Sequence, residues 1–134
     1  MSQENLEIAE RGIDAFNRRD VEVLAELTTR DFAWFPALPG TVEGGDYRGR
    51  DGIETYLGDI RDIWETLRVL GDEFHDLGDR VLALGRTEGR GQASGVQVDA
   101  PLAMVFDFRG GKISRVRTYF DRAEGLRVAG LSSV

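Results

Sequence analysis

The most informative part of the sequence is the segment PLAMVFDFRGGKISRVRTYFDRAEGLRVAGL, residues 101–131. It contains two runs of alternating apolar and polar residues on either side of Gly110-Gly111. Because a glycine pair readily adopts the positive φ angles of a tight turn, the two runs predict a long antiparallel hairpin. The second run leads into a short terminal helix, with Asp121 at the cap position and Gly130 at its end.

Alternation along this hairpin predicts two different faces. The inner face is apolar apart from one hydroxyl. Its members are Leu102, Met104, Phe106, Phe108, Val116, Thr118 and Phe120. The opposite face carries Asp99, Asp107, Arg115 and Arg117, which predicts cross-strand ion pairs on an outer surface. We therefore expect any functional pocket on the inner face.

The composition is typical of a small single-domain protein. With 134 residues, 41% of them hydrophobic, one domain over residues 1–134 can bury its own core. The absence of cysteine excludes disulfides and thiolate metal sites. The apolar runs are too short for a membrane span and the N-terminus does not resemble a secretion signal, so we expect a cytoplasmic protein without a membrane partner. The net charge of −7 argues against nucleic acid as a partner.

The first third of the chain predicts two helices and a short strand. Apolar residues at helical spacing indicate an amphipathic helix over residues 3–18. Asp20 is placed to cap a shorter second helix, because its carboxylate can accept hydrogen bonds from free N–H groups. Phe32–Pro36 then predicts a strand on which Phe32 and Trp34 share a face.

Turn-forming residues fill residues 39–49, PGTVEGGDYRG, and indicate a loop near the mouth of any enclosed space. Whether this loop closes as a lid stays open. After it, Asp51 followed by Glu54 resembles a capping box. Apolar residues at helical spacing then predict a long third helix that continues through Trp64 and Leu67.

The rest of the chain predicts strands. Val69–Asp76, Arg80–Arg90 and the two hairpin strands follow one another with no helix between them. Three helices followed by four such strands predict an α+β fold, in which a mostly antiparallel sheet folds over the N-terminal helices.

This order of elements resembles a known family. The loop with YRGRDGI, the long helix, RVLALGRTEGRG and FDFRGGKISRVRTYFDRAEGL look like the SnoaL-like branch of the nuclear-transport-factor-two-like superfamily, which includes ketosteroid isomerase and limonene epoxide hydrolase. The resemblance implies a conical, cystatin-like α+β barrel with a deep pocket on the concave face, usually in a homodimer. It does not imply one reaction, because the superfamily contains isomerases, cyclases, dehydratases, hydrolases and members that only bind.

Strand parity identifies Arg86 and Glu88 as the candidate catalytic pair. They follow Leu82 and Leu84 on the even positions of residues 80–90. If the leucines place this face inward, the two charges enter the pocket, where they must pair because an isolated buried ion is costly. Such a pair can hold a substrate oxygen or polarise a water. The odd positions are small, so the alternative, with both charges in solvent, stays open.

The resemblance points to the same pair. In the limonene epoxide hydrolase branch, an arginine and an aspartate two residues apart on this strand act with a second aspartate on the last strand. Arg86 and Glu88 match the first two positions, and Thr118 occupies the third. A threonine hydroxyl is no base at neutral pH, which leaves Glu88 as the base. Burial would raise the pKa of Glu88 and Arg86 would lower it.

Other residues are candidates for ligand binding. Trp34 can form a flat wall for a ring-shaped ligand, or it can be ordinary core. His75, the only histidine, can act as an acid or base near neutral pH, or it can lie in solvent beside a turn. The hairpin supplies Met104, Phe106, Thr118 and Phe120. No metal-ligand spacing is present, so we predict neither a metal nor a cofactor.

Two functions of different classes stay open. The first is a cofactor-free isomerase, cyclase or hydrolase acting on a hydrophobic, oxygenated small molecule, with proton transfer by Glu88. The second is a non-catalytic ligand-binding or dimerisation module. A homodimer is expected through the outer sheet face, where Ala103, Val105 and Tyr119 interrupt the charges. An Arg86–Glu88 pair facing an open cavity favours the enzyme.

Overall fold

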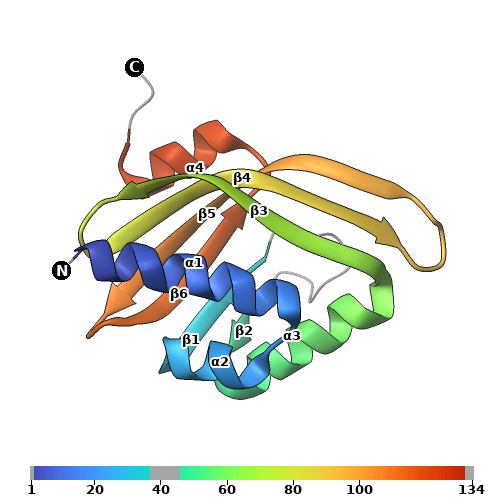
Figure 1. Ribbon diagram of the computed structural model, residues 1–134, viewed down its shortest axis with the longest axis horizontal. Coiled ribbons are helices and arrows are strands. Elements are labelled where there is room, and N and C mark those ends of the chain that lie inside the picture. Colours follow the sequence, from blue (N-terminus) through green and yellow to red (C-terminus); the bar gives the residue numbers. More distant parts are fainter. Residues whose placement is uncertain (1, 37–45, 132–134) are drawn as a thin grey trace.

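The computed structural model describes residues 2–36 and 46–131 (Figure 1). The helices are α1 (Ser2–Arg18), α2 (Val21–Leu27), α3 (Gly49–Ile63) and α4 (Arg122–Ala129). The strands are β1 (Thr28–Phe35), β2 (Tyr47–Arg48), β3 (Trp64–Asp76), β4 (Arg80–Gly91), β5 (Gln97–Arg109) and β6 (Lys112–Tyr119). None of the helices within the described ranges is long and apolar enough to cross a membrane.

The strands form one curved sheet in the order β2-β1-β6-β5-β4-β3. Neighbouring strands are antiparallel except β1 and β6, which run parallel. In Figure 1, α1, α2 and α3 lie on one side of this sheet and α4 lies on the other. The predicted α+β fold, a mostly antiparallel sheet folded over N-terminal helices, is confirmed.

The sheet separates two apolar clusters. The concave cluster joins the three N-terminal helices to inward residues such as Val81, Ala83 and Met104. The convex cluster is smaller and lies under α4. It contains Leu82, Leu84, Ala103, Val105 and Ala129, with Tyr119 packed against it. Ala103 and Val105, which the sequence suggested as part of a dimer surface, are therefore covered by the chain's own helix, and the homodimer stays a prediction.

The hairpin of β5 and β6 has the predicted turn and charge pattern. Gly110 and Gly111 both have positive φ, at 61° and 80°. Asp107 lies across from Arg115, whose Nε is 2.6 Å from its carboxylate. Arg80 and Arg117 donate to the same carboxylate over 2.9 and 3.3 Å. The predicted cross-strand pairs of Asp107 with Arg115 and Arg117 are confirmed, whereas Asp99 pairs with Arg86 of β4.

Two of the three predicted helix caps are correct. The Asp20 carboxylate accepts from the N–H of Val23 at the start of α2. The Asp121 carboxylate accepts from Ala123 and Glu124 at the start of α4, and Gly130, with φ of 92°, ends that helix. The predicted cap at Asp51 is wrong, because α3 begins at Gly49, two residues before Asp51. Asp51 lies inside its first turn, where a negative charge still favours the helix dipole.

The third helix is also shorter than predicted. It ends at Ile63, and Trp64 and Leu67 belong to β3. Leu67 is buried in the concave cluster, so its helical spacing to Ile60 is coincidental. β1 begins at Thr28, before the predicted strand. Residues 39–45 of the predicted loop lie outside the described residues, and Tyr47 and Arg48 form β2.

A bulge in β3 interrupts its regular pairing with β4. The register between β3 and β4 shifts between Gly71 and Glu73. This shift brings the Leu70 carbonyl so close to Gly85 that a Cβ at position 85 would collide with it. Glycine is therefore required at position 85, because any other residue would place a Cβ against this carbonyl.

Candidate functional site

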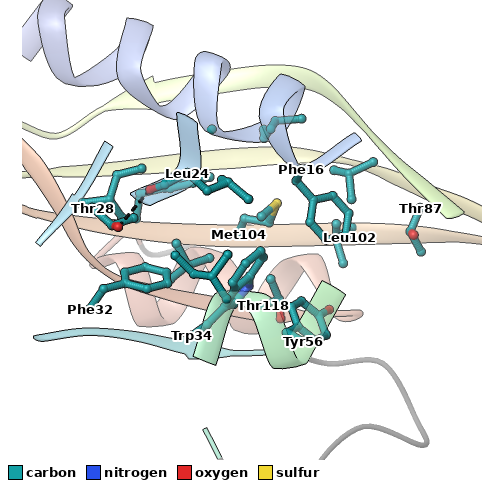
Figure 2. Close-up of a pocket in the computed structure, with 17 residues that line it drawn as sticks. Phe16, Leu24, Thr28, Phe32, Trp34, Tyr56, Thr87, Leu102, Met104 and Thr118 are labelled. Carbon is teal, nitrogen blue, oxygen red and sulfur yellow. Dashed lines mark hydrogen bonds between the residues drawn. The ribbon is translucent and has the colours of Figure 1, made fainter. Parts of the chain in front are cut away.

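A cavity of about 50 Å³ lies between the concave face of the sheet and the N-terminal helices (Figure 2). The residues around it come from α1, α2, α3 and every strand except β2. They are Gly12, Ile13, Phe16, Leu24, Thr28, Phe32, Trp34, Ile53, Tyr56, Val69, Thr87, Leu102, Met104, Phe106, Ile113, Val116 and Thr118. Most of them are aliphatic or aromatic, which makes this an apolar cavity.

Aromatic rings form one wall of the cavity. The Trp34 and Tyr56 ring centroids lie 4.6 Å apart with planes 73° apart, and the Phe16 and Trp34 centroids lie 5.6 Å apart. Phe32 packs edge-on against Trp34 from the other side. Edge-to-face contacts of this kind favour a fixed arrangement of the rings, so Trp34 is held rigidly.

Three threonine hydroxyls supply acceptor oxygens. Thr28 donates to the Leu24 carbonyl over 2.9 Å, the contact dashed in Figure 2. Thr118 donates to the Phe35 carbonyl over 2.7 Å, and Thr87 makes a longer contact of 3.4 Å to the Arg68 carbonyl. Because each hydroxyl proton is already used, these oxygens can only accept hydrogen bonds from a ligand.

Tyr56 and Trp34 supply the donors. Burial raises the pKa of Tyr56 above its usual range, and the nearby Tyr47 raises it further, so its hydroxyl is neutral at physiological pH. In the described part of the chain, neither the Tyr56 hydroxyl nor the Trp34 indole N–H has a hydrogen-bond partner. Tyr47 donates to Asp59 over 2.8 Å beside this group.

The cavity contains no carboxylate, histidine, lysine or arginine among the described residues that line it. No group of three or more potential metal ligands gathers elsewhere within residues 2–36 and 46–131. The described lining can therefore hold an apolar molecule and exchange hydrogen bonds with it, but it offers no side chain that takes up a proton near neutral pH.

The prediction that Arg86 and Glu88 enter the pocket is wrong. Leu82 pairs with Val105 across β4 and β5, which places the even positions of β4 on the convex face. Arg86 is exposed and pairs with Asp99, and Glu88 lies 3.4 Å from Arg68. The leucines of β4 did not identify its inner face, because both faces of this strand are buried near α4.

Thr87, between these two charges, is the residue of β4 that reaches the cavity. It is 1% exposed. The small odd positions of this strand were the available signal for an inward face that approaches a cavity. Phe16 and Tyr56 also line the cavity, but they lie on the apolar stripes of helices, where the sequence does not distinguish a cavity wall from ordinary core.

The remaining candidates divide in two. Trp34, Met104, Phe106 and Thr118 all line the cavity, where the sequence placed them. Phe120 packs against the concave cluster without lining the cavity. His75 lies near the end of β3, where its Nε2 is 2.5 Å from Glu73, and it is 36% exposed. It lies in a different part of the molecule from the cavity lining.

The sequence and the fold are similar to those of known proteins. Residues 9–116 match the family model for the SnoaL-like domain. Among solved structures, an NTF2-like protein from Burkholderia pseudomallei has a TM-score of 0.78 at 23% identity, covering 94% of this chain and 97% of that one. TerC, co-crystallised with polyporic acid, has a TM-score of 0.77 at 25% identity, covering 95% and 98%.

A further similar structure is a protein with a ketosteroid isomerase-like fold from Catenulispora acidiphila, in complex with trimethylamine. Its TM-score is 0.73 at 20% identity, and the alignment covers 93% of each chain. No match was found among curated proteins.

Proposed function

This chain belongs to the SnoaL-like domain family, and from its cavity we propose that it binds a small, predominantly hydrophobic molecule that carries oxygen atoms. The observation that carries the proposal is the lining, in which a few polar atoms converge on an otherwise apolar space. Small-molecule sites typically combine apolar walls with a few oriented polar groups.

The polar atoms define how the ligand is held. Tyr56 and Trp34 can donate hydrogen bonds to a carbonyl or ether oxygen, because their own protons have no partner among the described residues. Thr118 can accept one from a ligand hydroxyl. The apolar body of the ligand then contacts side chains such as Phe16 and Met104.

Binding is better supported than catalysis by proton transfer. A general base must lie within hydrogen-bond reach of the proton it removes, and Glu88 lies on the opposite face of the sheet from the cavity. The enzyme hypothesis that depended on Arg86 and Glu88 is therefore not maintained. The co-crystal of TerC with polyporic acid supports a small organic ligand for a protein of this fold.

A ring-sized ligand requires the cavity to widen. Its volume of about 50 Å³ is below the roughly 150 Å³ of an engineered cavity that binds benzene. Met104 is the lining side chain best suited to move, because it is unbranched and has several rotatable bonds. We expect it to change rotamer when a ligand enters.

Calorimetric titration with naphthalene-2-carboxamide, a neutral two-ring molecule with one carbonyl oxygen, tests the proposal. Gly12 lines the cavity, and a Cβ there would contact only the Ile113 side chain, at 3.4 Å, so Gly12→Val should fill the space. Gly58 lies in α3 outside the cavity, and a Cβ there would contact only Arg61, at 3.7 Å. Gly58→Val is therefore a matched control.

We expect the wild type and Gly58→Val to bind the amide alike, and Gly12→Val to bind it at least about tenfold more weakly, a loss of about 1.4 kcal/mol. Met104→Ala should bind it more tightly than the wild type, because truncation enlarges the cavity. Absence of binding to both the wild type and Met104→Ala would contradict the proposal, as would equal binding by the two glycine variants.

A further inference from the structure

Arg19 is a partly buried cation at the end of α1, next to the cavity. It has φ of 57°, a left-handed conformation that is uncommon for residues other than glycine. Its backbone N–H donates to the Phe16 carbonyl, and that of Asp20 donates to Ala15. This geometry closes the helix and turns the Arg19 side chain back toward it.

The guanidinium connects α1 to β3. Nη1 donates to the Phe16 carbonyl and Nη2 to the Leu67 carbonyl, each over 2.6 Å. The guanidinium carbon lies 4.8 Å from the centre of the Phe16 ring. Two of the five N–H groups of the guanidinium are thereby used, and the other three have no partner in the described part of the chain.

Arg19 differs from the other partly buried arginines in having no anionic partner within residues 2–36 and 46–131. The described residues include four arginines that are neither buried nor fully exposed: Arg19, Arg80, Arg115 and Arg117. The last three contact Asp107. Among the described residues no carboxylate forms an ion pair with Arg19, whose pKa is lowered by burial. The carbonyls at the end of a helix offset only part of such a charge.

The position of Arg19 links this charge to the ligand cavity. Phe16, under its guanidinium, lines the cavity, and so does Tyr56. The charge of Arg19 acts on the Tyr56 hydroxyl and lowers its pKa, but burial has the larger effect and raises this pKa overall. On its other side, Arg19 lines a surface groove with Leu67 and Glu88. Glu88 is already engaged by Arg68 and so does not neutralise Arg19.

We propose that Arg19, with the Tyr56 hydroxyl, binds an anionic oxygen of the ligand, so that the ligand class is an apolar acid with a carboxylate or an acidic enol or phenol. The apolar body occupies the cavity and the anionic oxygen lies at its Arg19 end. This inference rests on the proposed binding function. It adds a residue that determines specificity and the charge of the ligand.

Naphthalene-2-carboxylate and naphthalene-2-carboxamide form a matched pair of probes, equal in shape and different in charge. We expect the wild type to bind the carboxylate about tenfold more tightly than the amide, the scale of one charge-assisted hydrogen bond. Arg19→Gly removes the guanidinium and suits the left-handed backbone at this position. It should abolish the preference, measured as the ratio of the two affinities.

Two further variants separate recognition from structure. Arg68→Gln removes a positive charge from the same groove away from Phe16, and it should leave the ratio within about twofold of the wild type. Arg19→Lys keeps the charge and should retain part of the preference, which also covers the case in which Arg19→Gly does not fold. An equal loss for both probes in Arg19→Gly would overturn the inference, because it indicates a purely structural role. Failure of the wild type and Met104→Ala to bind the amide would instead contradict the proposed function.

Discussion

The concave and convex faces of the sheet are closed in different ways. On the concave face, three helices cover large side chains that leave a cavity beside Trp34 and Tyr56. On the convex face, α4 approaches so closely that a Cβ on Gly125 would collide with the Ala103 side chain. Beside that contact, one carboxylate, Asp107, holds three arginines. The first face encloses a cavity of about 50 Å³, and the second is fixed by close packing and charge.

This difference explains where function can lie. An apolar cavity whose Tyr56 and Trp34 donors have no partner among the described residues can widen around a ligand and bind its oxygen atoms. The ionic network around Asp107 is already paired within the chain, so its charges stabilise the fold. The contrast also makes Arg19 informative, because among the described residues it is a partly buried cation on the cavity side without such a carboxylate.

The largest effect is expected on the concave face, at Gly85. Gly85→Ala would push a methyl group into the backbone carbonyl of Leu70, which cannot move without opening the bulge in β3. We expect the free energy of unfolding to fall by about 3 kcal/mol, the upper part of the usual range for overpacking. Urea denaturation measures this, with Gly58→Ala as the control. A change below about 1 kcal/mol would mean that β3 is not held as described.

The next effect tests the charge network of the convex face. Asp107→Asn keeps the shape of the side chain but leaves three arginines without a counter-charge, and should lower the free energy of unfolding by about 1–3 kcal/mol. Asp31→Asn breaks an exposed pair with Arg109 that solvent screens, and it should lower the free energy of unfolding much less than Asp107→Asn does. Equal effects would remove the distinction between the two pairs.

The Asp107 contribution should also depend on pH. Burial alone would raise the pKa of Asp107, but hydrogen bonds from Arg115 and Arg80 and the charge of Arg117 outweigh it and lower the pKa overall. A carboxylate whose pKa is lower in the folded state than in the unfolded state stabilises the folded state at pH values above its ordinary pKa. This stabilisation is lost as the pH falls through the folded-state pKa. The stability gap between wild type and Asp107→Asn should therefore narrow below about pH 4. A gap that widens on acidification would contradict this sign.

The sequence correctly predicted those elements that neighbouring residues specify through a turn, an alternating pattern or a helix cap. The hairpin followed from Gly110-Gly111 and strict alternation, and α4 followed from Asp121 and Gly130. These signals are local, because a turn or a cap needs only neighbouring residues. The boundary between α3 and β3 was missed because Leu67 happens to continue the helical spacing.

The candidate site was only partly predictable, because α4 covers the outer face of β4 and hides which face of that strand is the inner one. The inner residues of β5 and β6, Met104 and Thr118 among them, were correctly placed since their strands have one markedly apolar face. In β4 the leucines that seemed to mark the inside pack under α4. Alternation cannot assign an inner face to a strand that is buried on both faces.

A smaller effect tests how α4 is held on the convex face. Asp121→Ala removes the carboxylate that accepts from Ala123 and Glu124, leaving free N–H groups at the start of α4. We expect a loss of about 1 kcal/mol in the free energy of unfolding, typical of a helix cap. Asp51→Ala is the matched control, since Asp51 does not cap its helix. A loss as large in the control would mean that general charge effects, and not capping, set the result.

The smallest effect should have the opposite sign, at Gly12 on the concave face. Unlike Gly85, Gly12 faces the cavity, and a Cβ there would meet only the Ile113 side chain at 3.4 Å, an ordinary contact with a flexible group. Gly12→Ala also improves the helix propensity of α1, so the free energy of unfolding should rise by up to about 1 kcal/mol. Thermal unfolding monitored by circular dichroism measures the change. A destabilised variant would indicate that the space beside Gly12 is already filled, which would also weaken the case for ligand binding there.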